Sequence, residues 1–211
     1  MHSIGIIGDP HAHPGPLAEA LAVLRRERVE AIWCTGDIAG YGNDVDESIA
    51  LLVQNDCQSV LGNHEIWYME KHANDASSNV RTQHYLHSLP LVWRATVAGK
   101  RLYMVHASPP DSMMTGIRLL DQQGNVLEAE KQAWSARLRD VDYDVLIVGH
   151  THQVFAETLG RTLVINPGST QYNHCCAVLR LPELQVEWFA LGGRAIIKSW
   201  NWGLTVRARD G

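Results

Sequence analysis

Cysteine is scarce in this sequence, with four residues in 211. Cys34 and Cys57 lie in apolar, strand-like runs, where a buried thiol packs as a small hydrophobe. Cys175 and Cys176 are adjacent, and neighbours in a strand point to opposite faces, so they are poorly placed to bridge. None belongs to a Cys-x-x-Cys pair. The sequence therefore predicts neither a disulfide framework nor a zinc knuckle.

Long apolar runs and basic clusters are also missing. No segment is long enough to cross a membrane, and residues 1–4 run straight into a predicted strand without a signal peptide, so we expect a cytoplasmic protein with no membrane partner. The formal net charge of -5 argues against a broad nucleic-acid surface. Since there is no internal repeat, low-complexity tract or linker, we expect a single domain over residues 1–211.

The first half of the chain alternates between strand and helix patterns. Residues 3–7 and 31–35 are apolar runs that predict strands, and the helix between them begins at Pro14. Asp44 and Glu47 predict a capping box for the next helix. This β-α-β order predicts a parallel pair of strands with a right-handed crossover.

The rest of the chain follows the same local rules. The predicted elements are a strand at 58–61, two helices within 66–89, a hairpin at 91–105, a loop over the site at 107–124, a helix that Asn125 and Glu128 start and that runs to about Asp140, and strands at 144–148, 154–158, 162–165, 175–179, 184–190 and 194–200. Alternating strands and helices, followed by antiparallel strands, indicate an α/β fold of two packed sheets with helices outside.

Polar side chains of the kinds that bind metals follow many of these strands. They are Asp9, His11, Asp37, Asn63, His106, His150 and His152. Strand ends are where open α/β sheets place their ligands, and residues two apart on an extended segment share a face. Any one of them alone could be an ordinary turn-capping residue. Seven in series indicate a common site.

Imidazole, carboxylate and amide ligands without thiolate suit manganese, iron, zinc, nickel or cobalt, and suit calcium poorly. Asp37 is the candidate for a carboxylate shared by two ions roughly 3.5–4 Å apart, the separation used for in-line displacement at phosphorus. The first ion would be held by Asp9, His11, Asp37 and His152. The second ion would be held by Asp37, Asn63, His106 and His150.

These motifs resemble, in type and order, the calcineurin-like metallophosphoesterase superfamily. The matching segments are Asp9-x-His11, Gly36-Asp37, Gly62-Asn63-His64-Glu65, Val105-His106, Gly149-His150-Thr151-His152 and Asn166-Pro167-Gly168-Ser169. The resemblance covers residues 4 to about 170. It implies a four-layer α/β-β/α sandwich, two-metal hydrolysis of phosphoric esters or nucleotide anhydrides, and His64 as the residue that protonates the leaving oxygen. The likeness is strongest to small bacterial phosphodiesterases and diadenosine polyphosphate hydrolases that carry the pattern Gly-Asp-x-x-Gly-Tyr-Gly, which is found here at residues 36–42.

The sequence departs from other branches of that superfamily near Asp37. Serine/threonine phosphatases have a phosphate-gripping arginine where this chain has Tyr41, and an aspartate that steers the acid histidine where it has Gly40. His13 stands where glycine or asparagine is usual. We take His13 and Tyr41 as candidate substrate-binding residues, and the group that orients His64 is left open.

We therefore expect an enzyme that uses two divalent ions, with manganese preferred, to hydrolyse a small nucleotide-like phosphodiester or anhydride. A metal-bound hydroxide would attack phosphorus in line. The alternatives are a phosphomonoesterase and a non-catalytic scaffold such as the retromer subunit that shares this fold. The acidic balance of the chain counts against a nuclease.

Overall fold

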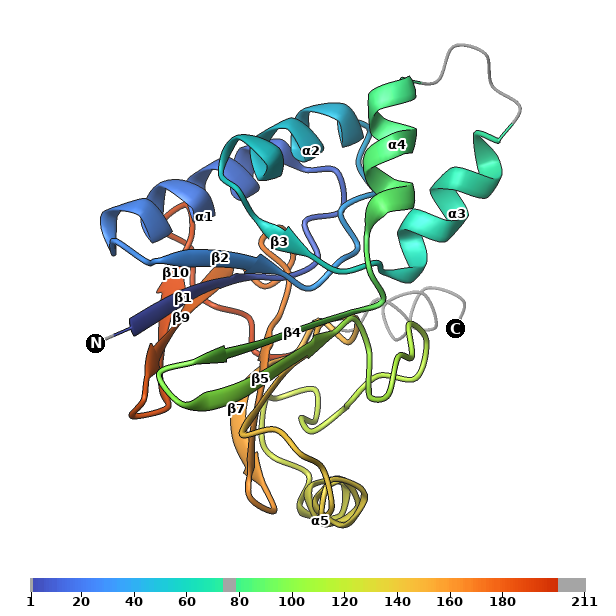
Figure 1. The fold of residues 1–211 in the computed structure, drawn as a ribbon. Helices are drawn as coiled ribbons and strands as arrows, with labels where there is room; N and C mark the ends of the chain where they lie inside the picture. Colours follow the sequence, from blue (N-terminus) through green and yellow to red (C-terminus); the bar gives the residue numbers. More distant parts are fainter. Residues whose placement is uncertain (1, 74–78, 201–211) are drawn as a thin grey trace, which may run out of the picture.

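This protein is described by a computed structural model over residues 2–73 and 79–200. Within these residues the chain forms ten strands and five helices (Figure 1). The strands are His2–Ile7 (β1), Ala31–Cys34 (β2), Gln58–Ser59 (β3), Val92–Val97 (β4), Lys100–Val105 (β5), Val145–Ile147 (β6), Val154–Leu159 (β7), Thr162–Pro167 (β8), Cys175–Leu181 (β9) and Gln185–Ala190 (β10). The helices are Pro14–Arg26 (α1), Val45–Gln54 (α2), Asn63–Lys71 (α3), Val80–Ser88 (α4) and Glu128–Arg137 (α5).

The strands form two five-stranded sheets, and both are mixed. The first has the order β10-β9-β1-β2-β3, in which β1, β2 and β3 are parallel and β9 is antiparallel to both neighbours. The second has the order β4-β5-β6-β8-β7, in which β5, β6 and β8 are parallel and the two edge strands are antiparallel. The predicted parallel pairing of the first two strands is confirmed.

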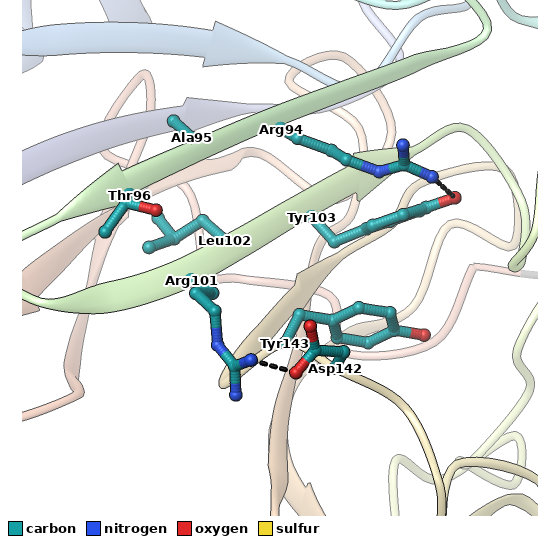
Figure 2. A pocket seen from close by; sticks show the side chains of 8 residues that line it. All are labelled: Arg94, Ala95, Thr96, Arg101, Leu102, Tyr103, Asp142 and Tyr143. Atoms are coloured by element: carbon teal, nitrogen blue, oxygen red, sulfur yellow. Dashed lines mark hydrogen bonds and ion pairs between the residues drawn. The ribbon is translucent and has the colours of Figure 1, made fainter.

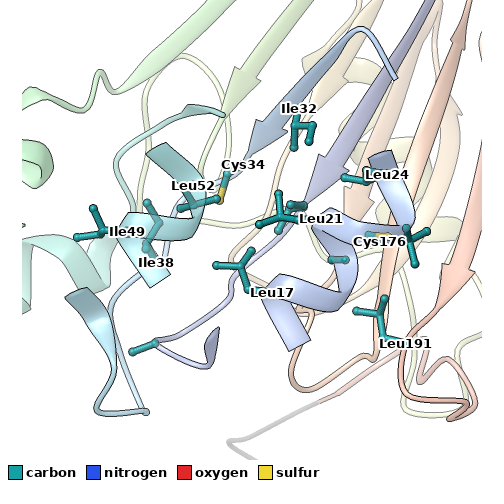
Figure 3. Packing of buried hydrophobic residues seen from close by; sticks show 14 of the residues in the cluster. Leu17, Leu21, Leu24, Ile32, Cys34, Ile38, Ile49, Leu52, Cys176 and Leu191 are labelled. Atoms are coloured by element: carbon teal, nitrogen blue, oxygen red, sulfur yellow. The ribbon is translucent and has the colours of Figure 1, made fainter. Parts of the chain in front are cut away.

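Three buried apolar clusters fill the spaces between layers. The first lies between the first sheet and the helices α1 and α2, and Figure 3 shows Leu17, Leu21 and Leu24 of α1 within it. The second lies between the sheets, where Ile6 of β1 and Met104 of β5 belong to one cluster. The third joins α5 to the outer face of the second sheet. The layers are thus helices, sheet, sheet and helix, and the predicted sandwich is confirmed.

Strand β1 shows how the sequence produces this layering. Its side chains alternate between faces, so Ile6 enters the cluster between the sheets while Ile7 enters the cluster under α1. A Cβ atom on Gly5 would lie 2.7 Å from Leu24 Cδ1. Glycine at this position therefore lets α1 pack directly on the strand.

The predicted capping box before α2 and the predicted start of α5 are wrong. Asp44 precedes α2, but its side chain makes no capping hydrogen bond. Helix α5 follows Leu127, whereas the prediction has it follow Asn125, two residues earlier. Asn125 instead donates its backbone and side-chain N–H groups to the carboxylate of Asp121, which closes a turn and leaves Asn125 outside the helix.

The strand predicted at residues 194–200 is also wrong. Within the described part of the chain, this segment forms one isolated bridge, between Ser199 and Gln153. The Trp200 N–H donates to the carbonyl oxygen of His152 at 3.1 Å. The segment therefore lies along the loop that carries His152 instead of extending a sheet.

None of the helices in residues 2–73 and 79–200 is both long and apolar enough to span a bilayer. The domain predicted over 1–211 includes residues 1, 74–78 and 201–211, which lie outside the described residues.

Candidate metal centre

The seven side chains predicted as metal ligands converge beyond the carboxyl ends of the parallel strands. Asp9 and His11 follow β1, Asp37 follows β2, Asn63 begins α3 after β3, His106 follows β5, and His150 and His152 follow β6. Three groups have ligand atoms within 4.8 Å of one another: Asp9 with His11 and His152, His11 with Asp37 and His64, and Asp37 with His106 and His150. The site is therefore built by both sheets together.

The carboxylate of Asp37 faces two of these groups at once. Its Oδ2 lies 3.9 Å from His11 Nε2, and its Oδ1 lies 3.3 Å from His106 Nε2. The Asn63 Oδ1 lies 3.2 Å from His106 Nε2 and 3.0 Å from His150 Nδ1. One carboxylate thus connects two clusters of donor atoms.

The cluster on the other side contains Asp9, His11 and His152. The His152 Nε2 lies 2.9 Å from His11 Nε2 and 3.4 Å from Asp9 Oδ2. All three residues are buried. Among the described residues, Asp9 Oδ2 has no hydrogen-bond partner. A buried carboxylate oxygen without a donor is costly, which points to a cation at this position.

The hydrogen bonds of the histidines identify which ring nitrogens face the site with a lone pair. The His106 Nδ1 lies 2.7 Å from the Thr35 carbonyl oxygen, and a carbonyl only accepts, so Nδ1 carries the hydrogen. In a neutral ring, Nε2 is then an acceptor, yet it faces the carboxylate of Asp37 and the amide oxygen of Asn63. Converging acceptors repel one another unless a proton on Nε2 or a metal cation lies between them. The donor set therefore fits a divalent metal, and the Thr35 carbonyl fixes the ring as outer ligands do in metal sites.

The electrostatics of the cluster agree with this donor set. Burial lowers the pKa of His150 to about 4 and that of His152 to about 3, so both rings are neutral at pH 7 and able to bind metal. Burial also disfavours charge on His106, but the charge of Asp37 and the hydrogen bond with it outweigh this and raise the pKa of His106 to about 10. The site attracts a positive charge at His106 Nε2.

The backbone of the site is strained. Five of the seven predicted ligands have positive φ: Asp9, His11, Asp37, His150 and His152. Non-glycine residues rarely adopt this conformation, although Asp and His tolerate it better than most. Such strain costs about 1–3 kcal/mol per residue and clusters at functional sites. An ordinary turn would have glycine or asparagine at such positions. Aspartate and histidine here indicate that the strained loop conformation serves to direct these side chains into the site.

Glu65 holds the loop that carries Asp37, a role that sequence reasoning missed. It is fully buried. Its Oε2 accepts hydrogen bonds from the N–H groups of Asp37 at 2.9 Å and Gly62 at 2.8 Å, and its Oε1 accepts from Ala39 at 2.8 Å. The only available signal was its position three residues after Gly62, where a glutamate closes a helix N-terminus.

The predicted Asn166–Ser169 motif supports the site from behind. The Asn166 side chain donates to the carbonyl oxygen of Gly149 at 3.0 Å, and Ser169 Oγ donates to the carbonyl oxygen of Asp9 at 2.6 Å. Asn166 lies in β8, whereas Ser169 lies just after this strand. The motif thereby joins the loops of the two sheets.

His64 is held by rings rather than by a second carboxylate. Its ring centroid lies 4.7 Å from the rings of Tyr41 and Trp67. Its Nε2 lies 3.9 Å from Asp37 Oδ2. A Cβ atom on Gly40 would lie 2.9 Å from His64 Nδ1 and 2.4 Å from the ring of His11, so only glycine fits there. Aromatic packing thus orients the ring, and burial lowers its pKa.

A cavity of about 190 Å³ opens over the cluster. Its described lining includes Asp37, Asn63, His64, His150 and His152, together with Tyr41, Trp67, Arg118, Thr151 and Trp200. Tyr41 therefore lies where a substrate would pass. His13 is not among the described lining residues, and its ring lies 5.9 Å from that of Tyr172. Arg118 was missed because it belongs to no motif or periodic pattern, and Trp200 was missed because it was assigned to the predicted strand at 194–200.

A larger cavity of about 640 Å³ lies over β4 and β5, on residues outside the predicted site. Figure 2 shows its charged groups engaged with their neighbours: Arg101 pairs with Asp142, and Arg94 lies over the ring of Tyr103 at 4.8 Å. Size alone therefore does not identify the functional site, and the smaller cavity holds the converging donors.

Comparisons with known proteins agree with this arrangement. The sequence model of the calcineurin-like phosphoesterase superfamily domain matches residues 2–180. The uncharacterized protein MJ0912 of Methanocaldococcus jannaschii is 25% identical over 179 residues, which are 78% of this chain and 68% of that protein.

Solved structures show the same fold at low sequence identity. A metallophosphoesterase from Sphaerobacter thermophilus has a TM-score of 0.68 and 21% identity, covering 91% of this chain and 89% of that chain. The hypothetical protein PH1004 from Pyrococcus horikoshii OT3 has a TM-score of 0.71 and 15% identity, covering 100% of this chain and 93% of that chain.

Proposed function

From the premise that this chain belongs to the calcineurin-like phosphoesterase superfamily and is a metal-dependent hydrolase, we propose that it hydrolyses a phosphodiester or nucleotide anhydride with two divalent ions. The observation that carries the proposal is the carboxylate of Asp37, whose two oxygens face two separate donor clusters. Manganese is the preferred ion, because histidine and oxygen donors without thiolate suit it.

The proposed ligands divide at Asp37. The first ion would be held by Asp9, His11, Asp37 and His152, and the second by Asp37, Asn63, His106 and His150. When bound, the two ions lower the pKa of the attacking water and neutralise charge on the phosphoryl oxygens. The protein orients the ligands through Thr35, Glu65 and Ser169.

His64 is the proposed general acid. Its backbone N–H donates to Asp37 Oδ1 at 3.0 Å, which keeps the residue beside the proposed bridging carboxylate, while its ring contacts those of Tyr41 and Trp67. Because burial lowers its pKa, its protonated form is a stronger acid than an ordinary imidazolium. It would donate a proton to the leaving oxygen. Tyr41 lines the cavity beside His64 and is the proposed substrate contact, and His13 is a second proposed substrate contact.

The test is an assay of purified protein with manganese on bis(p-nitrophenyl) phosphate and on p-nitrophenyl phosphate, with metal content measured on the same sample. We expect turnover of the diester, its loss with a chelator, and its recovery on adding manganese. Faster turnover of the monoester would favour a phosphatase. A fully metal-loaded protein without turnover of any phosphoric ester would favour a scaffold and reject the proposal.

A further inference from the structure

Arg118 is the one permanent cation among the described residues that line the cavity over the metal cluster. The two residues beside it are buried and anchored. The carbonyl oxygen of Ile117 accepts from Thr151 Oγ1 at 3.1 Å, and the N–H of Leu119 donates to Gln153 Oε1 at 2.8 Å. The backbone of Arg118 is thus fixed to the loop that carries His150 and His152, while its side chain is exposed.

Close packing at Gly116 holds the segment that carries Arg118 against the metal-binding loop. A Cβ atom on Gly116 would lie 2.4 Å from Thr151 Cγ2 and 2.8 Å from His150 Cδ2, so glycine lets the segment lie directly against the metal-binding loop. Within the described residues, no carboxylate lies within 4.0 Å of the Arg118 guanidinium. An arginine with no acidic partner among the described residues, in a chain of net charge -5, is available for an anion.

Trp67 lies on the same rim, one helical turn after His64 in α3. Its side chain is 48% exposed although its ring packs 4.7 Å from the ring of His64. An exposed indole beside the proposed proton donor contacts whatever group departs with the leaving oxygen. Since the cavity of about 190 Å³ is too small to enclose a nucleotide, most of a large substrate would lie on this rim.

We propose that the substrate is a nucleoside polyphosphate type of anhydride, whose base stacks on Trp67 and whose non-reacting phosphate binds Arg118. This inference rests on the proposed two-metal function. Two bound divalent ions would neutralise the phosphoryl group under attack, so a further fixed cation at the rim matches a second phosphate charge, which a simple diester lacks. Arginine binds phosphate in a bidentate manner, and an aromatic ring stacks on any base.

The reaction is hydrolysis of a P–O–P bridge. The oxygen of water bonds to the attacked phosphorus, the bridging P–O bond on that phosphorus breaks, and the bridging oxygen leaves as a terminal oxygen of the second phosphate. One proton of the water goes to solvent, and His64 donates a proton to the departing oxygen. No oxidant or other co-reactant is needed.

Binding is measured first, by calorimetry on the manganese-loaded protein with two probes: a methylene-bridged nucleoside triphosphate, which cannot be hydrolysed at the bridge, and inorganic phosphate. A charged hydrogen bond contributes about 1.5–3 kcal/mol, so Arg118→Ala should weaken binding of the nucleotide analogue roughly 10- to 100-fold. It should change the affinity for inorganic phosphate less than about twofold. Arg118→Lys keeps the charge and should recover part of the loss. Arg94→Ala, a change in the distal cavity of Figure 2, is the matched control and should have no effect.

The indole ring of Trp67 is tested by the same binding measurements. Stacking contributes about 1–3 kcal/mol per base, so Trp67→Ala should weaken binding of the nucleotide analogue roughly 5- to 100-fold. It should leave the affinity for inorganic triphosphate unchanged. Trp67→Phe should retain most of the affinity.

Kinetics separate this inference from the proposed function. For a dinucleoside polyphosphate, Arg118→Ala should raise KM at least tenfold, while KM for bis(p-nitrophenyl) phosphate stays within about twofold. Equal losses on both substrates would place Arg118 on the attacked phosphoryl group and overturn the inference, as would a wild-type protein that hydrolyses diesters but does not bind the analogue. Absence of any phosphoesterase turnover would instead defeat the proposed function.

Discussion

At the scale of single residues, the site depends on which atom of each side chain faces inward. Asp37 is the clearest case, because its two oxygens face His11 and His106 separately. No other carboxylate among the described residues faces both clusters. The two donor clusters should therefore respond differently to substitution.

We predict that Asp37→Asn disrupts both metal sites, whereas His11→Ala mainly empties one. The amide of asparagine is neutral and offers one oxygen, so it cannot replace a carboxylate that bridges two cations. Elemental analysis after dialysis measures metal per chain in each variant. Two ions and full activity in Asp37→Asn would remove Asp37 from the centre of the site.

The pKa of His106 gives a prediction about protons. A metal ligand must be a neutral imidazole, and the pKa of His106 near 10 means that the metal-free protein carries a proton there at pH 8. Manganese uptake at pH 8 should therefore release about one proton from this ring, whereas His150 and His152, with pKa values of about 4 and 3, release none.

Calorimetry in two buffers of different ionisation enthalpy measures this release. An ordinary imidazole, with a pKa of about 6.5, would release almost nothing at pH 8 and more at pH 6. That opposite trend in the wild type would contradict the assignment, and His106→Asn should reduce the release.

His64 should matter for some substrates and not for others. A general acid increases the rate roughly 10²–10⁴-fold, and only where the departing oxygen needs a proton. We predict that His64→Ala retains both metals, loses kcat steeply on an alkyl phosphodiester, and loses much less on a nitrophenyl diester, whose leaving group departs as an anion. The measurement is kcat on both substrates, with metal content checked. Equal losses would indicate a role in positioning instead.

At the scale of elements, strand ends and glycines determine where the ligands stand. Strand β2 ends at Cys34, and Gly36 and Gly62 then bring two loops into contact. A Cβ atom on Gly62 would lie 2.3 Å from Asp37 Oδ1 and 2.5 Å from Asp37 N. The start of α3 is thus packed directly against the proposed bridging carboxylate.

Gly62→Ala should consequently displace Asp37. A shift of about 1 Å at a reacting centre costs roughly 10²-fold in rate, so we expect a loss of that order together with weaker metal binding. Gly15→Ala in α1 is the matched control, because no atom lies within 4 Å of the position of its Cβ. It should keep full activity and gain up to about 1 kcal/mol in free energy of unfolding. Similar activity in both variants would show that the close packing at Gly62 is unimportant.

At the scale of the whole molecule, the site connects the two sheets. Asp9, His11, Asp37 and Asn63 come from the first sheet and its loops, and His106, His150 and His152 from the second. Bound ions would therefore hold the edges of the sandwich together, in addition to the apolar cluster between the sheets.

Removal of metal should lower thermal stability as well as activity. A ligand at 100 times its Kd stabilises the native state by about 2.7 kcal/mol, which corresponds to roughly 5–10 °C in Tm for a chain of this size. Differential scanning calorimetry before and after chelation, with manganese added back, measures the shift. An unchanged Tm in a verified metal-free sample would show that the ions do not join the sheets.

The sequence by itself determined the residue types, their order and the family. Short apolar runs predicted all ten strands, because strand formation depends on alternation over a few residues. Each ligand was found because it directly follows such a run or, like Asn63, opens the helix after it. The capping box at Asp44, the helix start at Asn125 and the strand at 194–200 were wrong although the local pattern was present. Asp44 makes no capping hydrogen bond, Asn125 bonds to Asp121 in a turn, and the 194–200 segment lies along the loop that carries His152.

Only the tertiary structure decided which side chains meet. His11 and His152 are 141 residues apart in sequence, and their ring nitrogens lie 2.9 Å apart because two sheets end at the same place. The roles of Glu65 and Arg118 depend on such contacts between distant loops, which no spacing along the chain encodes. Local patterns specify elements, whereas burial of apolar faces between layers brings their ends together, and that packing creates the site.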